Sequence, residues 1–290
     1  MARRLRVYLF ILPAVLFMFI FLIFPLATSF YLSFTKYNYA YSDHPKFIAL
    51  GNYLHLLQDA NFVVALRNTM YYFSIFFPGL ISLSLSIAIL LNQKIRGTTF
   101  FTPALLLPTV VPLTLAGVAF IWILSENFGI VNHILKNVLG MPFLTHSWLV
   151  ERETAMISLA VVGLWKYTGF AMILFLAGLQ AIPETLYDAA KMDGANSVQI
   201  FSRITLPNLK ESFILVGIWG IIQSVKVFEQ AFVMTKGGPG RTTLVLYLYA
   251  WKTAFRFFEM GYAASIAYII GIIILVLAFV NFALLKTERM

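Results

Sequence analysis

Long stretches without a single charged residue constrain this chain more than any other feature of its sequence. Four of them cover residues 7–35, 68–93, 97–125 and 260–285. A helix needs about 20 residues to cross a hydrocarbon core about 30 Å thick, and a charge inside that core is costly. Each stretch is therefore expected to form one transmembrane helix. A β-barrel is excluded, because its strands would alternate in polarity over about ten residues.

Two further apolar stretches are long enough to cross a membrane but contain charges. They cover about residues 154–179, with Lys166, and residues 212–235, with Lys226 and Glu229. Only 11% of the residues are charged and 60% are hydrophobic, whereas an average soluble domain has roughly 25% charged residues. The sequence therefore predicts an all-α integral membrane protein with six transmembrane helices.

The distribution of lysine and arginine predicts the orientation of these helices. With a cytoplasmic N-terminus, ten basic residues fall in inside segments and nine in outside loops, but the inside segments are much shorter. The first helix also follows the basic flank "RRLR". We expect both termini in the cytoplasm, and we assign the net charge of +9 to this bias and to anionic lipid, with no support for nucleic-acid binding.

The two ends of the chain and its composition limit the remaining possibilities. The first apolar stretch far exceeds the 7 to 15 residues of a signal-peptide core, so it is expected to remain as an anchor. The absence of cysteine excludes disulfides, thiolate metal sites and a lipoprotein anchor. We divide the sequence into an N-terminal anchor helix with an external loop, residues 1–67, and a core, residues 68–290.

A polar stretch between the fourth and fifth predicted helices stands out in this apolar chain. Pro183 suits a first helical position and Gly194 a helix C-terminus, while Asn196 or Ser197 can cap a second helix, with Gln199 three residues after Asn196 as in a capping box. That second run is expected to stop before Pro207. The prediction is a cytoplasmic helix-turn-helix with a low-relief surface of small residues, and the alternative is an ordinary solvated loop.

The same stretch resembles a family motif. The residues that carry the resemblance are Asp188, Ala189, Ala190, Asp193, Gly194, Ala195, Ile204, Leu206 and Pro207. Their spacing resembles the EAA loop of permease subunits from binding-protein-dependent ABC importers, with Asp188 in place of the leading Glu. Segments 50–69, 129–132 ("GIVN") and 235–243 ("TKGGPGRTT") resemble the carbohydrate branch, of which the maltose-type permease is best known. That branch usually has Phe-Asp where this chain has Phe228-Glu229.

What the resemblance implies is a place in a larger assembly. Residues 184–209 are expected to be coupling helices that contact the ATPase, and the external loop with Gly237, Gly238 and Pro239 is expected to face the outside. The implied partners are a second homologous permease, two ATP-binding subunits and an external sugar-binding protein, in the inner membrane of a bacterium or archaeon.

Catalysis is not expected of this chain itself. It contains no G-x-x-x-x-G-K-[ST] phosphate-binding loop, so ATP and Mg²⁺ are expected on partner subunits and no cofactor on this one. The histidines have no ligand spacing, and a metal site is not expected. The histidines in question are His44, His55, His133 and His146.

Polar residues inside the predicted spans suggest a substrate pathway. Gln223 lies about eleven residues after Ser212, which at 1.5 Å per residue places it about 16 Å deep in the membrane. Intervals of four, three and four residues separate Trp219, Gln223, Lys226 and Gln230, so these side chains share one face of the helix. The predicted pathway residues are Trp165, Lys166, Tyr167, Trp219, Gln223, Lys226, Glu229 and Gln230. Amides and charges can bind sugar hydroxyls, and aromatic rings can cover sugar CH faces.

Several alternatives remain open from sequence alone. Lys226 and Glu229 could simply neutralise each other, and Lys166 could extend its flexible stem toward the membrane surface. An ion-coupled secondary transporter would normally show inverted repeats, which this chain lacks, and a membrane enzyme would need clustered catalytic groups. An ABC permease for another solute is also possible, and the sequence does not distinguish a neutral from an anionic sugar.

Overall fold

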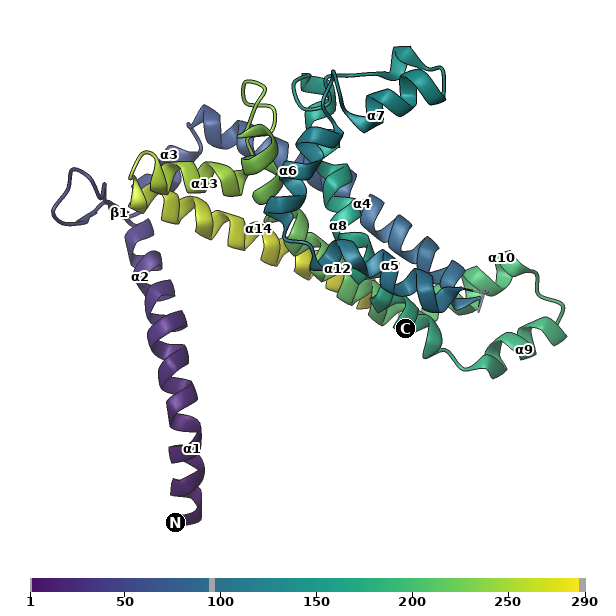
Figure 1. Cartoon of the computed structure of the whole chain (residues 1–290). Coiled ribbons are helices and arrows are strands. Elements are labelled where there is room, and N and C mark those ends of the chain that lie inside the picture. Colours follow the sequence, from purple (N-terminus) through teal and green to yellow (C-terminus); the bar gives the residue numbers. More distant parts are fainter. Residues whose placement is uncertain (1, 94–96, 287–290) are drawn as a thin grey trace. The chain divides into compact units, whose positions relative to one another are not determined.

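The computed structural model describes residues 2–93 and 97–286, and it is mostly helical (Figure 1). Three of the charges predicted to lie inside, Lys94, Arg96 and Arg289, fall outside the described residues. Two compact units are present, one of Met1–Val63 with Tyr249–Ile272 and one of Val64–Leu248 with Ile273–Met290. The sequence division at residues 67 and 68 lies inside a helix and stays a prediction.

Four helices among the described residues are long and apolar enough to cross a membrane, or five spans if one bent pair is counted as one. The long helices are α1–η1–α2 (Ala2–Met18, Phe19–Ile23 and Phe24–Ser33), α4 (Ala60–Asn92), α8 (Arg152–Gln180) and α14 (Met260–Lys286). The second begins at Ala60, eight residues before the predicted start, because a helix continues past the charge-free part that the membrane requires. The six predicted spans are therefore not confirmed among the described residues.

The third predicted span is broken instead of straight. It consists of α5 (Thr98–Val110) and α6 (Leu113–Ile123), which are bent by 99° at Val111 and Pro112. Proline has no N–H to continue the helical ladder and disfavours helical backbone in the residue before it. Val111 accordingly has an extended backbone, with φ −65° and ψ 126°. The expectation of one helix over residues 97–125 was wrong at this point.

The fifth predicted span is interrupted as well. Helix α12 (Lys210–Val225) stops before Lys226, and a π-helical turn, η5 (Ala231–Thr235), follows after a short non-helical link. Neither proline nor glycine occurs between residues 226 and 235, so no local signal announces the break. The expected continuous helix over residues 212–235 is therefore also corrected.

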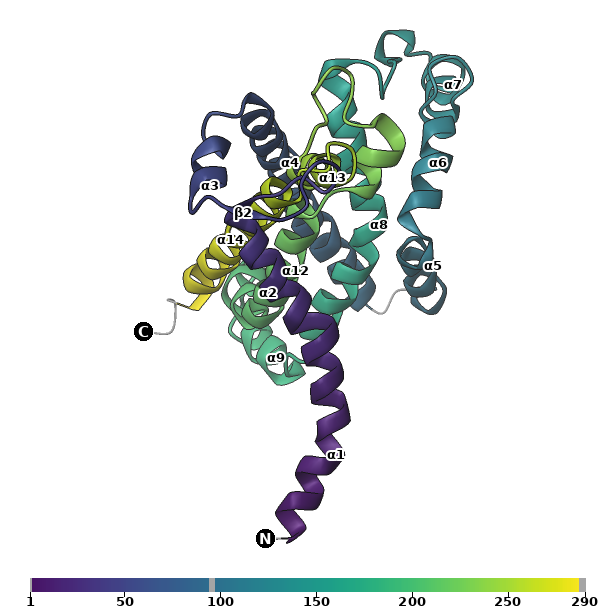
Figure 2. The ribbon, with the colours of Figure 1, turned by 90° about the vertical axis from the view of Figure 1, so that its left-hand side faces the viewer.

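Helix α8 lies at the centre of the larger unit. Half of its most apolar window is buried, the largest share among the four long helices. It packs against α12 and against α5 and α6 (Figure 2). Side chains such as Leu159, Met172 and Phe175 are fully buried along it. Movement of α8 would therefore disturb most of this unit.

The smaller unit is held together by polar side chains near the helix ends. A short hairpin pairs β1 (Thr35–Lys36) with β2 (Lys46–Phe47), followed by α3 (Gly51–Leu56). The buried Asn52 donates to the Ser33 and Thr35 carbonyls at 2.8 and 2.9 Å. These bonds satisfy the Ser33 carbonyl, which the end of α2 leaves without a helical partner, and the Thr35 carbonyl of β1.

Asp59 joins α4 to the two helices that follow later in the chain. Its carboxylate accepts hydrogen bonds from Tyr249 of α13 (Leu246–Phe255) and, at 2.6 Å, from Tyr262 of α14. Burial alone would raise the pKa of Asp59, but the two tyrosine hydroxyls and the Asn61 and Phe62 N–H groups hold it below its ordinary value.

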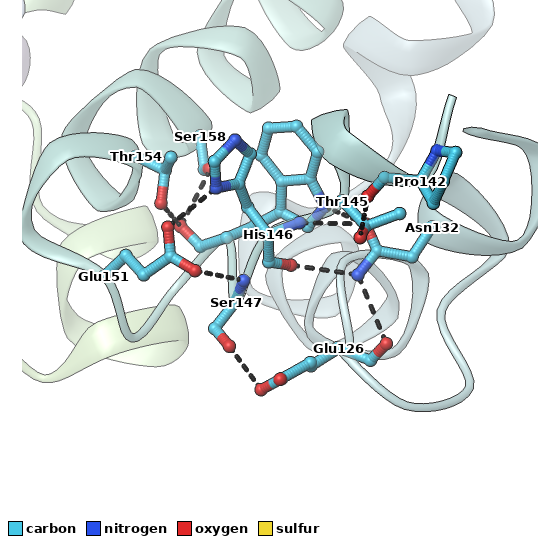
Figure 3. A network of polar contacts seen from close by, with 10 residues as sticks. Glu126, Asn132, Pro142, Thr145, His146, Ser147, Glu151, Thr154 and Ser158 are labelled. Carbon is cyan, nitrogen blue, oxygen red and sulfur yellow. Dashed lines mark hydrogen bonds and ion pairs between the residues drawn. The ribbon is translucent and has the colours of Figure 1, made fainter. Parts of the chain in front are cut away.

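A separate network orders the loop between α6 and α8 (Figure 3). This loop contains α7 (Ile130–His133), η2 (Ile134–Val138) and η3 (Pro142–Leu144). Asn132 donates to the Glu126 and His146 carbonyls at 3.2 and 2.9 Å, and its own oxygen accepts from Trp148 Nε1 at 2.8 Å. The side chain that ends the "GIVN" segment thus closes the loop.

Candidate functional site

The polar stretch after α8 forms the predicted helix-turn-helix. It consists of α9 (Glu184–Met192), α10 (Ser197–Ile200), η4 (Phe201–Thr205) and α11 (Leu206–Asn208). We call residues 184–209 the coupling segment. Its turn closes on Gly194, whose φ of +77° is left-handed. The Gly194 N–H donates to the Lys191 carbonyl at 3.0 Å and the Ala195 N–H to the Ala190 carbonyl at 2.9 Å, which together form a Schellman motif.

The second helix of the segment begins with the predicted capping box. The Gln199 N–H donates to the Asn196 side chain at 2.9 Å, and the Asn196 N–H donates to the Gln199 side chain at 2.8 Å. Two details differ from prediction: Pro183 is the N-cap and not the first helical residue, and the helical run continues through Pro207 to Asn208. Pro207 is tolerated because it lies in the first turn of α11, where its missing N–H costs little.

Most of the coupling segment is exposed, including apolar side chains. Met192 is 88% exposed and Val198 74%. The motif residues are exposed at Asp188, Ala189, Asp193, Gly194 and Pro207, half-buried at Ala195 and Leu206, and buried at Ala190. Tyr187 and Thr205 bring their hydroxyls within 3.3 Å and so join the two helices. The result is a preformed surface that carries three exposed large apolar side chains, Leu186, Met192 and Val198.

The coupling segment connects directly to the helices on both sides. Three residues separate α8 from α9, and α12 begins at Lys210, two residues after α11 ends. Such short connections transmit displacement because they contain few rotatable bonds. Displacement of the coupling segment would therefore also displace the adjoining ends of α8 and α12.

Aromatic side chains from α8 and α12 meet in the middle of these helices. Trp219 contacts Tyr167 edge-on, with ring centroids 5.5 Å apart, and Phe170 at 4.8 Å. Trp165 points elsewhere and contacts Phe120 of α6 at 5.2 Å. The structure thus brings Tyr167 and Trp219 together and leaves Trp165 apart from them.

The predicted polar face of the fifth span divides at the break after Val225. Gln223 is half-buried, whereas Lys226 and Glu229 are exposed and form no ion pair of 4.0 Å or less with each other in the described chain. Gln230 is only 1% exposed and donates to the Tyr72 hydroxyl at 3.3 Å. Gln223, Lys226 and Glu229 therefore remain the candidates for contact with a solute, while Gln230 already has a buried partner.

A glycine makes room for this buried pair. A Cβ at Gly163 of α8 would lie 2.4 Å from the Tyr72 hydroxyl and 3.0 Å from Gln230 Nε2. Small residues allow such close helix contacts inside membranes. Tyr72 and Gly163 were not identified from the sequence, because only the folded chain brings them to Gln230.

Lys166 has a different environment from Lys226. Its side chain is 8% exposed, and its ammonium donates to the carbonyls of Pro108, Thr109 and Val111 at 3.0, 2.6 and 2.5 Å. An ammonium has three N–H donors, and all three are used within the chain. The expected contact of Lys166 with substrate has no support in this geometry, and neither has a stem extended toward the membrane surface.

The loop after η5 forms the tight turn that its glycines predict. The Thr243 hydroxyl pairs with that of Thr235 at 2.7 Å and donates to the Gly238 carbonyl at 2.6 Å. Asn68 of α4 donates to the Arg241 and Leu244 carbonyls at 2.7 and 2.9 Å and so fixes the loop to that helix. The role of Asn68 was not visible from sequence, because its partners lie more than 170 residues away.

The described residues contain no group of three or more His, Asp or Glu side chains that could hold a metal ion. The chemistry available in the spans is hydrogen bonding, charge and aromatic contact. Groups of these kinds can bind a polar solute.

Comparison with known proteins agrees with this geometry. Residues 80–287 match the family model described as "Binding-protein-dependent transport system inner membrane component". The lactose transport system permease protein LacF of Rhizobium radiobacter is 33% identical, over 95% of this chain and 92% of that protein. The arabinooligosaccharides transport system permease protein AraP of Bacillus subtilis is 32% identical, over 98% and 89%.

A solved structure shares the fold. It is the crystal structure of a bacterial alginate ABC transporter in complex with an alginate pentasaccharide-bound periplasmic protein. One of its chains superposes with a TM-score of 0.79 at 21% identity, over 97% of this chain and 93% of that one.

Proposed function

This chain belongs to the family of binding-protein-dependent transport system inner membrane components, and we propose that it is the permease subunit of an ATP-driven importer for a carbohydrate. As a member of that family it is a multi-pass membrane protein that carries solute and is not itself catalytic. Similarity to permeases named for lactose and for arabinooligosaccharides supports a saccharide as the solute. No observation described above favours a solute other than a saccharide.

The observation that carries the proposal is the coupling segment. It is a rigid helix-turn-helix, exposed and partly apolar, and it is joined to α8 and α12 by very short links. An ATP-binding subunit that moves on nucleotide binding would take this segment with it. Both termini and the coupling segment then lie in the cytoplasm, and the loop at Gly237–Pro239 lies outside.

The solute pathway lies where α8 and α12 meet. Tyr167 and Trp219 offer aromatic faces to the CH groups of a sugar, and Gln223, Lys226 and Glu229 offer hydrogen bonds to its hydroxyls. The break after Val225 exposes Lys226 and Glu229 without an ion pair between them. Charged side chains that do not pair with each other can bind a solute and then release it.

The complete transporter contains further subunits besides this chain. A second, similar permease completes the pathway, two ATP-binding subunits hydrolyse ATP with Mg²⁺, and an external solute-binding protein delivers the sugar. The solved alginate transporter is in complex with a periplasmic protein that holds the saccharide, which supports the last of these partners. The proposed location is the cytoplasmic membrane.

The test is transport by the purified complex in liposomes. We expect uptake of a saccharide that requires ATP inside, the solute-binding protein outside, and all membrane subunits. Uptake that proceeds without ATP but follows an imposed proton or sodium gradient would contradict the proposal and favour a secondary transporter. Isothermal titration of the solute-binding protein with neutral and acidic saccharides would identify the solute class.

A further inference from the structure

The burial of the Lys166 ammonium against backbone carbonyls is not explained by contact with a substrate. Its buried ammonium contacts three carbonyls at the 99° break between α5 and α6. A lysine inside a membrane-spanning helix is costly and needs a compensating role. Here the compensation is structural, since every N–H of the ammonium has an acceptor.

The sequence explains why these carbonyls need a donor. In a continuous helix the Pro108 carbonyl would accept from the N–H four residues later, but that residue is Pro112, which has none. The chain leaves the helix at Val111, so the last carbonyls of α5 also have no helical partner. The positive charge of Lys166 sits at the negative end of the α5 dipole, where cations are favoured.

A second contact fixes α5 to α8 one turn further along. A Cβ at Gly169 would lie 2.1 Å from the Leu105 carbonyl oxygen and 3.3 Å from Leu106 Cα, so the two backbones are in direct contact. The Thr109 hydroxyl also donates to the Lys166 carbonyl at 3.3 Å. Directional bonds at Lys166 and close packing at Gly169 therefore tie the end of α5 to α8.

On the other side of the break, α6 rests on a different element. A Cβ at Gly117 would lie 3.2 Å from Val233 and 3.5 Å from Met234, both in η5. Helix α6 also meets α8 through a T-shaped ring contact between Phe120 and Trp165, which has none of the hydrogen bonds that Lys166 provides between α8 and α5. The break thus separates a segment bound to α8 from one that rests on η5.

We propose that Lys166 is a positioning residue that makes α5 follow α8, so that displacement of the coupling segment bends the third span at Val111–Pro112. The inference rests on the proposed function, because it needs an ATPase to move the coupling segment. Lys166 then acts through backbone carbonyls and does not touch the solute. Displacement of α8 then moves α5, and the chain bends at the break, which acts as a hinge.

The first test replaces Lys166 in the complete complex. Lys166→Met keeps the length of the side chain and removes its donors, whereas Lys166→Arg keeps donors and charge. We expect Lys166→Met to lower the number of saccharides carried per ATP hydrolysed by at least about fivefold, the lower end of usual coupling between sites. The KM for uptake should change by less than about twofold, and Lys166→Arg should recover most of the ratio.

Other outcomes would overturn the inference. An increased KM with an unchanged ratio of saccharide to ATP would make Lys166 a substrate contact. A lower yield of complex with an unchanged ratio and KM would make it a purely structural residue. Loss of ATP-driven uptake in the wild-type complex would instead refute the proposed function, so the two failures are distinguishable.

The second test needs no change at Lys166 and therefore does not depend on whether its variants fold. The chain has no cysteine, so pairs of spin labels can be placed at will on exposed positions: Leu107 of α5, Val161 of α8 and Leu115 of α6. Between nucleotide-free and ATP-trapped complexes, we expect the Leu107–Val161 distance to stay constant and the Leu107–Leu115 distance to change. A constant distance across the break, or a changing one between α5 and α8, would refute the hinge.

Discussion

Replacement of Gly194 separates the effect of backbone strain from that of contact with a partner. Its φ of +77° is left-handed, and no heavy atom lies within 4 Å of a Cβ built on it. A side chain there costs about 1–2 kcal/mol of strain, less for Asn, which tolerates this conformation. Because no atom of the chain is in the way, Gly194→Ala and Gly194→Trp should cost the subunit nearly the same.

These variants are expected to differ in how they affect contact with an ATP-binding subunit. If an ATP-binding subunit lies against the turn, the indole of Gly194→Trp meets its surface, whereas Gly194→Asn and Gly194→Ala add only a few atoms. Loss of 3 kcal/mol of contact corresponds to a factor of about 150 in affinity. We expect the Trp variant to lose ATP-driven uptake by more than about tenfold, and the Asn and Ala variants to keep more than about a third of it.

The assay combines uptake, ATP hydrolysis and assembly for the same preparations. Saccharide uptake and ATPase activity are measured in liposomes, and retention of the ATP-binding subunits is measured by size-exclusion chromatography. Gly140, which has φ +64° and equally free space in the loop before α8, provides the matched control as Gly140→Trp. Wild-type uptake by Gly194→Trp, or an equal loss in Gly194→Ala, would refute the reasoning.

Three further predictions concern the span, the external loop and the outer network. Because Lys226 and Glu229 form no ion pair in the described chain, Lys226→Met should impair uptake and the additional Glu229→Gln should not restore it; full recovery would mean that the two only neutralise each other. A cysteine at Gly240, which is exposed, should react with a membrane-impermeant thiol reagent in intact spheroplasts, and reaction only after lysis would reverse the topology. The Ser147 N–H and the His146 side chain hold the pKa of Glu151 below the ordinary value of a glutamate. These contacts stabilise the loop above that ordinary value, and the stabilisation is lost as pH falls through the lowered pKa. Amide protection in residues 126–151 should therefore decrease only below the ordinary value of roughly 4.3, whereas a decrease already between pH 7 and 5, or an identical pH profile in Glu151→Gln, would contradict it.

The features predicted correctly from sequence are those that local chemistry determines. Gly194 and Asn196 specify their own turn and cap within a few residues, and the structure contains both motifs. The existence of long apolar helices follows in the same way from composition. Pro112 is a similar local signal for the bend in the third span, whereas the length of that span and its lack of charge do not indicate a bend.

The remaining features depend on contacts between distant residues. The link after Val225 contains no helix-breaking residue, so its position reflects packing in the folded chain. Lys166 was assigned to the pathway from its depth, yet depth does not reveal which groups surround a side chain. Its three carbonyl partners lie 55 to 58 residues earlier. Gln230 and Tyr72 are 158 residues apart, and no periodic pattern in either helix indicates their contact.

The closure of the outer loop by Asn132 has a consequence for how such chains can diversify. The bonds of this side chain reach Glu126, His146 and Trp148, all within the same loop (Figure 3). The end of the loop is bound in addition by Glu151, which contacts His146 and Ser147, and by Thr154 and Ser158 of α8, which donate to the Trp148 carbonyl. A segment whose polar contacts lie within one stretch of the chain can be exchanged between homologues as a unit, as is usual for insertions at loops. Grafting residues 126–158 as one unit, with Asn132 and Glu151 included, should therefore preserve expression, whereas a cut between Asn132 and Trp148 should not.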